Sequence, residues 1–330
     1  MRTNSLVPQR VAVVLNPIKL QADEARDAVI LACRKGGWSD PEFYLTEVDD
    51  SGYSMARRAV EDGADVVLAA GGDGTVRAVA ETLAGTDTAL GLVPLGTGNL
   101  LARNLGANLA DPRQCVDVAL FGSEKSIDTV SFNVERADGT TGKNRFLVMG
   151  GGGFDAQIMA DTKDDLKDMV GWIAYGEAGA RHLFNRPGWA RFRVDGGEWE
   201  SARSRSVMVC NCGELTGGMV LVPDAKLDDG VLDLVVMSPR SMLGWARMAA
   251  KVLLRHTHDL PVIDFHRGKH VRAEFWDATE SQIDGDSLGK ITAFESEVFP
   301  SSLRVRVAPS MADLDEPEAP VINAADPDKI

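Results

Sequence analysis

The stretch Asp65-Val66-Val67-Leu68-Ala69-Ala70-Gly71-Gly72-Asp73-Gly74-Thr75-Val76 decides the fold of the first part of this 330-residue chain. It begins as a short apolar run, which is typical of a buried strand. Three glycines around Asp73 follow, and a helical pattern begins near Thr75. Glycine lets backbone N–H groups approach a ligand closely, and the first N–H groups of a helix have no partner within it. The stretch therefore predicts a phosphate-binding loop, with an ordinary strand-to-helix turn as the alternative.

A second loop of the same kind lies about twenty residues later, in Leu92-Val93-Pro94-Leu95-Gly96-Thr97-Gly98-Asn99. Loops that follow neighbouring parallel strands meet at the carboxyl edge of the sheet, where such sheets bind ligands. The first loop is not a Walker A loop, because no Lys-Ser or Lys-Thr follows its glycines. It is not a dinucleotide fingerprint either, since Thr-Val-Arg follows Gly74.

Strand and helix patterns alternate regularly up to about residue 122, which indicates an open, mostly parallel α/β domain. The strands are expected at residues 10–16, 42–48, 65–70 and 89–94, and the helices at 22–36, 52–63, 75–84 and 97–105, with one more beginning at Pro112.

The remainder is β-rich, and the turn signals between its segments indicate antiparallel strands. Strands are expected at residues 126–136, 144–149, 190–195, 204–212, 219–223, 231–237, 270–275, 281–284 and 303–307. Helices are expected at 164–185 and 241–255, and the acidic segment 310–330 is expected to be disordered.

The net charge of −14 argues against nucleic acid as a partner. No apolar run is long enough to span a bilayer and no signal peptide is evident, so a cytoplasmic protein is expected. The segment 240–255 carries four cations beside Trp245 and no acidic residue. It predicts a peripheral contact with an anionic membrane, or a helix packed on the sheet with solvated cations. The oligomeric state stays open, a homodimer included.

Five motifs in order resemble the catalytic domain of the diacylglycerol and sphingosine kinase superfamily, over about residues 10–308. They are Asn16-Pro17, Gly71-Gly72-Asp73-Gly74-Thr75, Pro94-Leu95-Gly96-Thr97-Gly98-Asn99, the segment 217–233, and Asp284-Gly285-Asp286. The resemblance implies an ATP-binding α/β domain in residues 1–125, to which a strand near 300–309 returns. It also implies a lipid-binding β-sandwich-like domain in residues 126–299, with the active site in the cleft between the two.

The resemblance also assigns roles to individual residues. ATP contacts fall on Asn16, Thr46, Gly71, Gly72, Asp73, Gly74, Thr75, Thr97, Gly98 and Asn99. Asp73 would organise phosphate and metal. Asp229 falls at the Mg²⁺ ligand, with the carbonyls of Lys226 and Val231 as partners, and this all-oxygen set suits Mg²⁺. Asp286, or its neighbour Asp284, would take the proton from the lipid hydroxyl. Without the resemblance, the segments that contain Asp229 and Asp286 would each be predicted to be a hairpin turn, because both combine Asp with Gly.

The function implied is an ATP- and Mg²⁺-dependent lipid kinase that converts diacylglycerol to phosphatidic acid. A sphingoid-base or ceramide kinase and a catalytically weak nucleotide- or lipid-binding homologue are the alternatives. Four positions depart from the family pattern, one of them Asp286, since the usual base is Glu, which is one methylene longer. Lys19 replaces one of the small residues that usually follow Asn-Pro, and Arg77 and Ala78 stand where Asn and Glu are frequent.

Overall fold

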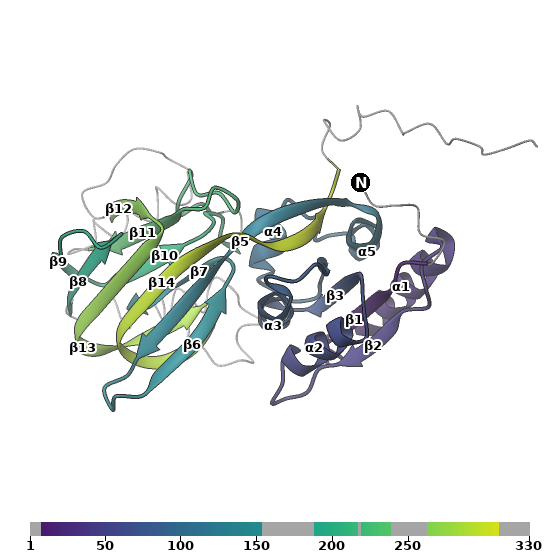
Figure 1. The fold of residues 1–330 in the computed structure, drawn as a ribbon, viewed down its shortest axis with the longest axis horizontal. Helices are drawn as coiled ribbons and strands as arrows, with labels where there is room; N and C mark the ends of the chain where they lie inside the picture. Colours follow the sequence, from purple (N-terminus) through teal and green to yellow (C-terminus); the bar gives the residue numbers. More distant parts are fainter. Residues whose placement is uncertain (1–7, 154–187, 217–218, 239–262, 310–330) are drawn as a thin grey trace, which may run out of the picture.

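The computed structural model describes residues 8–153, 188–216, 219–238 and 263–309, which form two lobes side by side (Figure 1). Four segments singled out in the sequence lie outside the described residues: the helical patterns at 164–185 and 241–255, Gly217-Gly218, and the segment 310–330. Among the helices that are described, none is both long and apolar enough to cross a membrane.

The first lobe is the predicted open α/β domain. Its elements are β1 (Val11–Leu15), α1 (Ala22–Gly36), β2 (Glu42–Leu45), α2 (Tyr53–Glu61), β3 (Val66–Gly71), α3 (Asp73–Leu83), β4 (Ala89–Pro94), α4 (Leu100–Asn104) and α5 (Pro112–Phe121). The strands pair in parallel in the order β2-β1-β3-β4. Helix α5 begins as Asp111-Pro112 predicts, because the Asp111 carboxylate accepts hydrogen bonds from Arg113 N and Gln114 N.

Helices cover both faces of this sheet because its central strands are apolar at every position. Val11, Val13 and Leu15 of β1 pack with residues of α1 and α5, whereas Ala12 and Val14 pack with residues of α2 and α3. The alternation fixes the register of β1 against its neighbours. Parallel pairing places the carboxyl ends of β1, β3 and β4 together at one edge.

The second lobe is built from mostly antiparallel strands. They are β5 (Ser123–Glu135), β6 (Thr141–Phe146), β7 (Met149–Gly153), β8 (Gly188–Val194), β9 (Glu200–Ser204), β10 (Ser206–Cys210), β11 (Leu232–Met237), β12 (Ile263–Gly268), β13 (His270–Ile283) and β14 (Asp286–Val307). Their inner faces form an apolar core in which the rings of Phe132 and Phe294 stack 4.8 Å apart. The predicted combination of an α/β domain with a β-sandwich domain is therefore correct.

Several strand predictions in this lobe were wrong in detail. Residues 219–223 form no strand and contribute only the isolated bridge between Glu214 and Val220. The single strand expected at 144–149 is divided between β6 and β7. Residues 270–275 and 281–283 belong to one strand, β13, which continues through a register shift between Glu274 and Thr279, and Asp284 lies in the turn after it. Strands β9 and β12 were not predicted at all.

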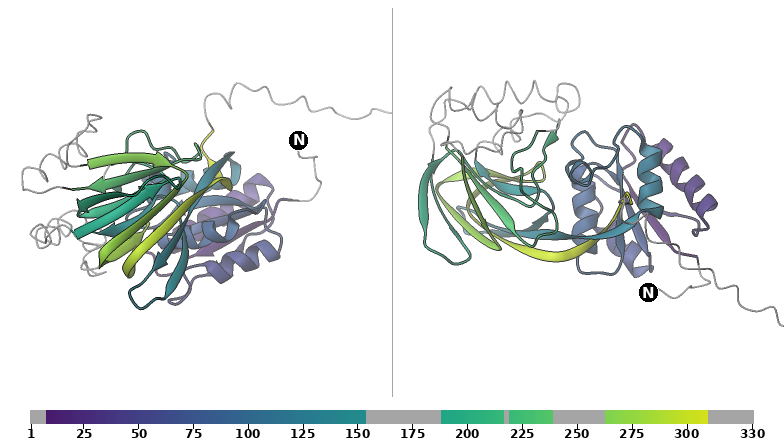
Figure 2. Two further views of the ribbon diagram at one scale, coloured as in Figure 1. Left: turned by 60° about the vertical axis from the view of Figure 1, so that its left-hand side comes forward. Right: turned by 90° about the horizontal axis from the view of Figure 1, so that it is seen from above.

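Two long strands join the lobes. β5 pairs along its whole length with the part of β14 that begins at Ala293, from Glu135 with Ala293 to Ser123 with Val307. Figure 1 shows both crossing from the β-rich lobe to the α/β lobe, and the view from above in Figure 2 shows the same passage. At its far end β14 lies parallel to β4, with Val305 opposite Leu90. The two lobes are thus connected by a continuous hydrogen-bonded sheet.

The turn between β13 and β14 brings a part of the second lobe against the first. Asp284 and Gly285 have φ values of 46° and 89°, which is the backbone of a two-residue hairpin whose central residues both have positive φ. The predicted turn at Asp284-Gly285-Asp286 is therefore present. Asp286 is the first residue of β14, immediately beyond the turn.

Candidate active site

The carboxyl edge of the parallel sheet gathers the residues that the sequence assigned to ATP. The backbone N–H of Asn16 donates to Ala70 O at 2.9 Å, and that of Thr46 donates to Leu15 O at 2.9 Å. Asn16, Thr46 and Gly71 therefore stand at the ends of three adjacent strands, β1, β2 and β3. The topology brings them to one edge from positions 55 residues apart in the chain.

The loop after β3 runs into α3 with only Gly72 between them. The helix begins at Asp73, two residues before the predicted start at Thr75. Gly72 is extended, with φ −92° and ψ −172°, and no side chain caps the helix. The first N–H groups of α3 have no acceptor within the helix, and the helix dipole adds partial positive charge there. We call residues 71–75 the phosphate cradle.

The second loop packs directly on the cradle. A Cβ atom built on Gly96 would lie 2.7 Å from the Cα of Gly72, and one on Gly98 would lie 2.4 Å from Asp73 Oδ2. Only glycine fits such approaches, which explains the glycines at these two positions. The carboxylate of Asp73 accepts hydrogen bonds from Asn99 N at 2.8 Å and from Leu100 N at 2.6 Å. Asp73 therefore caps the start of α4 and joins the two loops.

Asn99 holds the second loop in shape. It has a positive φ of 49°, which asparagine tolerates better than most residues. Its buried side chain accepts from Gly96 N at 3.1 Å and donates to Gly96 O at 2.6 Å. Thr97, in the middle of the same loop, is exposed. Asn99, one of the residues predicted to contact ATP, is thus committed to the loop itself.

The carboxyl group of Asp73 has a perturbed acidity. Burial raises its pKa to about 6, and the nearby carboxylates of Asp284 and Asp286 act in the same direction. The N–H groups of Leu100 and Asn99 oppose the shift by stabilising the ionised form. The charge of Asp73 is therefore sensitive to pH in a range where most aspartates are fully ionised.

Asp284 is wholly enclosed in the second lobe. It is 4% exposed, and its carboxylate accepts hydrogen bonds from the backbone N–H groups of Leu147, Val148 and Met149 at 2.9, 2.9 and 3.0 Å. Burial raises its pKa, while Arg77 and the three N–H groups oppose that effect. With both oxygens occupied, Asp284 anchors the β13–β14 hairpin to the connection between β6 and β7.

Asp286 faces the phosphate cradle. Its side chain is 49% exposed, and a Cβ atom on Gly74 would lie 3.1 Å from its Oδ2. The same oxygen accepts a hydrogen bond from Arg77 Nη2 at 2.7 Å. Of the two aspartates of the motif, only Asp286 has a carboxylate oxygen that accepts no hydrogen bond from the residues that the structure describes. The sequence identified Asp286 and noted Arg77 as a departure, but no local signal could pair residues 209 positions apart.

The predicted metal ligands do not present an open oxygen set. Asp229 Oδ2 accepts from Arg267 Nη2 at 2.7 Å, and its Oδ1 accepts from Val231 N at 3.1 Å. Arg267 also contacts buried Asp233, through Nε and Oδ1 at 3.0 Å. Within the described residues there is no cluster of three or more His, Cys, Asp or Glu side chains that could hold a metal ion. As arranged, this group does not fit a divalent cation, because Arg267 already neutralises Asp229; the metal role of Asp229, Lys226 and Val231 stays a prediction.

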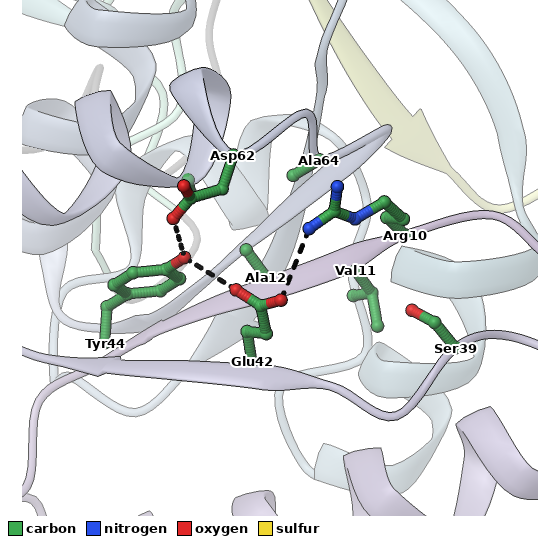
Figure 3. Close-up of a pocket in the computed structure, with 9 residues that line it drawn as sticks. Arg10, Val11, Ala12, Ser39, Glu42, Tyr44, Asp62 and Ala64 are labelled. Carbon is green, nitrogen blue, oxygen red and sulfur yellow. Dashed lines mark hydrogen bonds and ion pairs between the residues drawn. The ribbon is translucent and has the colours of Figure 1, made fainter.

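A small polar pocket at the opposite edge of the same sheet is a separate feature (Figure 3). Tyr44 Oη lies 2.8 Å from the carboxylate of Glu42 and 2.8 Å from that of Asp62, so its single proton is available to either one, and Arg10 pairs with Glu42 at 3.4 Å. Its polar groups satisfy one another, and its lining includes the amino-terminal residues of β1 (Figure 3). It is therefore distinct from the candidate site at the strands' carboxyl ends.

Comparison with known proteins shows the family of this chain. Residues 10–132 match the diacylglycerol kinase catalytic domain, and residues 150–307 match the YegS C-terminal NAD kinase beta sandwich-like domain. A probable lipid kinase YegS-like from Pseudomonas fluorescens is 32% identical over 240 residues, covering 72% of this chain and 76% of that protein. The chain belongs to the diacylglycerol kinase family of lipid kinases.

A second relative and a solved structure are also similar to this chain. A diacylglycerol kinase from Bacillus subtilis is 26% identical over 267 residues, covering 80% of this chain and 84% of that protein. The fold also matches the crystal structure of a putative diacylglycerol kinase from Bacillus anthracis, with a TM-score of 0.71 and 22% identity over 91% of this chain and 97% of that one. The lipid kinase is thus an enzyme whose family implies use of a nucleotide.

Proposed function

We propose that this lipid kinase transfers the γ-phosphoryl group of ATP to the hydroxyl of diacylglycerol and forms phosphatidic acid. The observation that carries the proposal is the position of Asp286 beside Gly74, within the first turn of α3. A half-exposed carboxylate from one lobe lies against the phosphate cradle of the other. A base and an anion-binding helix start are the two parts that phosphoryl transfer to an alcohol requires from the protein.

The chemistry follows from these two parts. The lipid oxygen forms a bond to the γ-phosphorus as the bond from that phosphorus to the β–γ bridging oxygen breaks, and ADP leaves. Asp286 accepts the hydroxyl proton. The N–H groups at the start of α3 stabilise the phosphate oxygens, on which negative charge is concentrated. Most of the rate enhancement would come from positioning and charge stabilisation, because the protein does little covalent chemistry in such a transfer.

ATP is proposed to bind as its Mg²⁺ complex, which neutralises charge on the β- and γ-phosphates. The residues at the carboxyl edge suit the nucleotide's phosphates, since the helix N-terminus offers N–H donors that no capping side chain occupies. Asp73 is engaged with Asn99 and Leu100, so its contribution is to hold the second loop in place. We further propose that the enzyme meets its lipid at a membrane surface, from the cytoplasmic side.

Transfer of radiolabelled phosphate from ATP to a panel of diacylglycerol, sphingosine and ceramide tests the proposal. Label is expected in phosphatidic acid. Label in sphingosine or ceramide alone would contradict the proposed acceptor while leaving the lipid kinase activity intact. Absence of label in every lipid, with ATP still bound, would favour a binding protein that retains the fold.

The Asp286→Asn variant tests the base. Its turnover is expected to fall by roughly 10²- to 10⁴-fold, with ATP affinity nearly unchanged, because an amide cannot accept the proton. Asp277→Asn is the matched control, since Asp277 is an exposed aspartate on β13 of the same lobe. Wild-type turnover in Asp286→Asn would overturn the assignment of the base.

A further inference from the structure

Arg77 connects the phosphate cradle to the hairpin that carries Asp286. It lies in α3, one helical turn after Asp73. Its guanidinium donates from Nη1 to the carbonyl of Ile283 at 3.0 Å and from Nη2 to Asp286 Oδ2 at 2.7 Å. Both acceptors belong to the β13–β14 hairpin, more than 200 residues away in the chain. One side chain thus bonds the main chain of the hairpin and the carboxylate at its end.

The environment of Arg77 keeps its guanidinium charged and in one place. The side chain is only 11% exposed. Burial acts to lower its pKa, but the carboxylates of Asp284 and Asp286 outweigh burial and raise it. On the other side, Tyr53 Oη donates to Glu81 at 3.0 Å, and Arg77 acts to lower the pKa of that tyrosine. A planar guanidinium that lies between Tyr53 of the first lobe and the hairpin of the second has little freedom to move.

Arg77 is not needed to shape the hairpin itself. Asp284 already holds the hairpin to the second lobe through three backbone N–H groups. What Arg77 adds is a contact to the side chain of Asp286, which is half exposed and has no other hydrogen bond to a described residue. Oδ2 is fixed between Arg77 and Gly74, and Oδ1 is left for a substrate hydroxyl.

We propose that Arg77 is a positioning residue that sets the orientation of Asp286 relative to the phosphate cradle. The inference rests on the proposed function, in which Asp286 takes the proton of the lipid hydroxyl. Arg77 lies one turn after Asp73 in α3, the helix whose start forms the cradle. Its hydrogen bond to Asp286 therefore sets the distance between the base and the phosphates that the cradle would bind. Misplacement of a catalytic group by about an ångström costs on the order of 10²-fold in rate.

Steady-state kinetics of Arg77→Ala and Arg77→Lys, each made in the wild-type and Asp286→Asn backgrounds, test the proposal. In Arg77→Ala, kcat is expected to fall by roughly 10²-fold while KM for ATP changes little. Arg77→Lys keeps the charge but loses the pair of guanidinium donors, so its kcat should lie between those of the wild type and Arg77→Ala. In the Asp286→Asn background Arg77→Ala should cause little further loss, because both changes act through the same carboxylate.

Arg304→Ala is the matched control. Arg304 Nη2 pairs with Asp87 at the same distance, 2.7 Å, and its Nη1 donates to the carbonyl of Asp87 at 3.3 Å. This pair is exposed and lies away from the cradle, so kcat should stay at the wild-type value. Thermal midpoints of all variants separate a loss of folding from a loss of positioning, and Arg77→Lys keeps the test open if Arg77→Ala does not fold.

Two results would overturn the role of Arg77. One is an unchanged kcat in Arg77→Ala, and the other is a double variant with Asp286→Asn whose loss in kcat equals the product of the two single losses. A wild-type enzyme that labels no lipid at all would instead overturn the proposed function. The two failures are therefore distinguishable within the same experiment.

Discussion

The carboxylate of Asp73 accepts a hydrogen bond from Leu100 N at 2.6 Å, which ties the first residue of α3 to the start of α4. Neither helix caps itself with a side chain, since the N-cap residues Gly72 and Asn99 provide no such hydrogen bond. The two loops of the candidate site are therefore held in register by one acidic residue. Its state of ionisation should matter for both.

The pH dependence of stability is the first prediction. The pKa of Asp73 is raised by burial from 3.8 to about 6, so between these values the native state holds a proton that the unfolded state has lost. The free energy of unfolding that Asp73 contributes at low pH is therefore lost as the pH rises, by up to about 3 kcal/mol between pH 4 and 6. Urea unfolding across this range should show that the free energy of unfolding of the wild type falls relative to that of Asp73→Asn as the pH rises. A constant difference would contradict the raised pKa.

The two aspartates of the hairpin should respond oppositely to substitution. Asp284→Ala leaves three backbone N–H groups without an acceptor and should lower the free energy of unfolding by roughly 3 kcal/mol or more. Asp286→Ala removes the half-exposed partner of Arg77, which keeps its hydrogen bond to the carbonyl of Ile283, so it should cost less stability than Asp284→Ala, yet abolish transfer. Urea unfolding and kinase assays on both variants check this. Equal stability losses would refute the division of roles.

Local sequence predicted the α/β lobe well because its strands and helices are each defined by their own periodicity. The predicted helix at 22–36 agrees with α1 at both ends, and the glycine loops were located from the order of residues after each strand. β9 and β12 were missed because their residues are mostly polar, as Glu200–Ser204 illustrates, and only pairing with β8 and β11 makes them strands. The contact of Arg77 with Asp286 depends on how two lobes pack, which no local pattern encodes.

Gly98→Ala should disturb nucleotide binding more than folding. The added methyl group would lie 2.4 Å from Asp73 Oδ2, so the second loop must move away from the cradle. KM for ATP is expected to rise by roughly 10-fold, equivalent to about 1.4 kcal/mol of binding free energy. Gly188→Ala is the matched control, because a Cβ atom there meets no atom within 4 Å. Unchanged ATP affinity in Gly98→Ala would show that this contact does not shape the nucleotide site.

Arg267 provides a test of the predicted metal ligand. It pairs with Asp229 at 2.7 Å and with Asp233 at 3.0 Å, so it supplies the positive charge that a cation would otherwise supply. We therefore expect Mg²⁺ without nucleotide to leave the thermal midpoint of the wild type unchanged. Arg267→Gln leaves two neighbouring carboxylates unneutralised and should lower the midpoint, and Mg²⁺ should then restore part of it.

Arg272→Gln is the control for that substitution, since Arg272 also bridges two carboxylates, Glu135 at 3.0 Å and Glu274 at 3.1 Å. Its midpoint should fall without a response to Mg²⁺, because its partners come from two separate strands and lie apart from the Asp229 loop. A wild-type midpoint that rises with Mg²⁺ would instead show that the cation displaces Arg267. In that case the original prediction of Asp229 as a magnesium ligand would hold, and Arg267 would be its competitor.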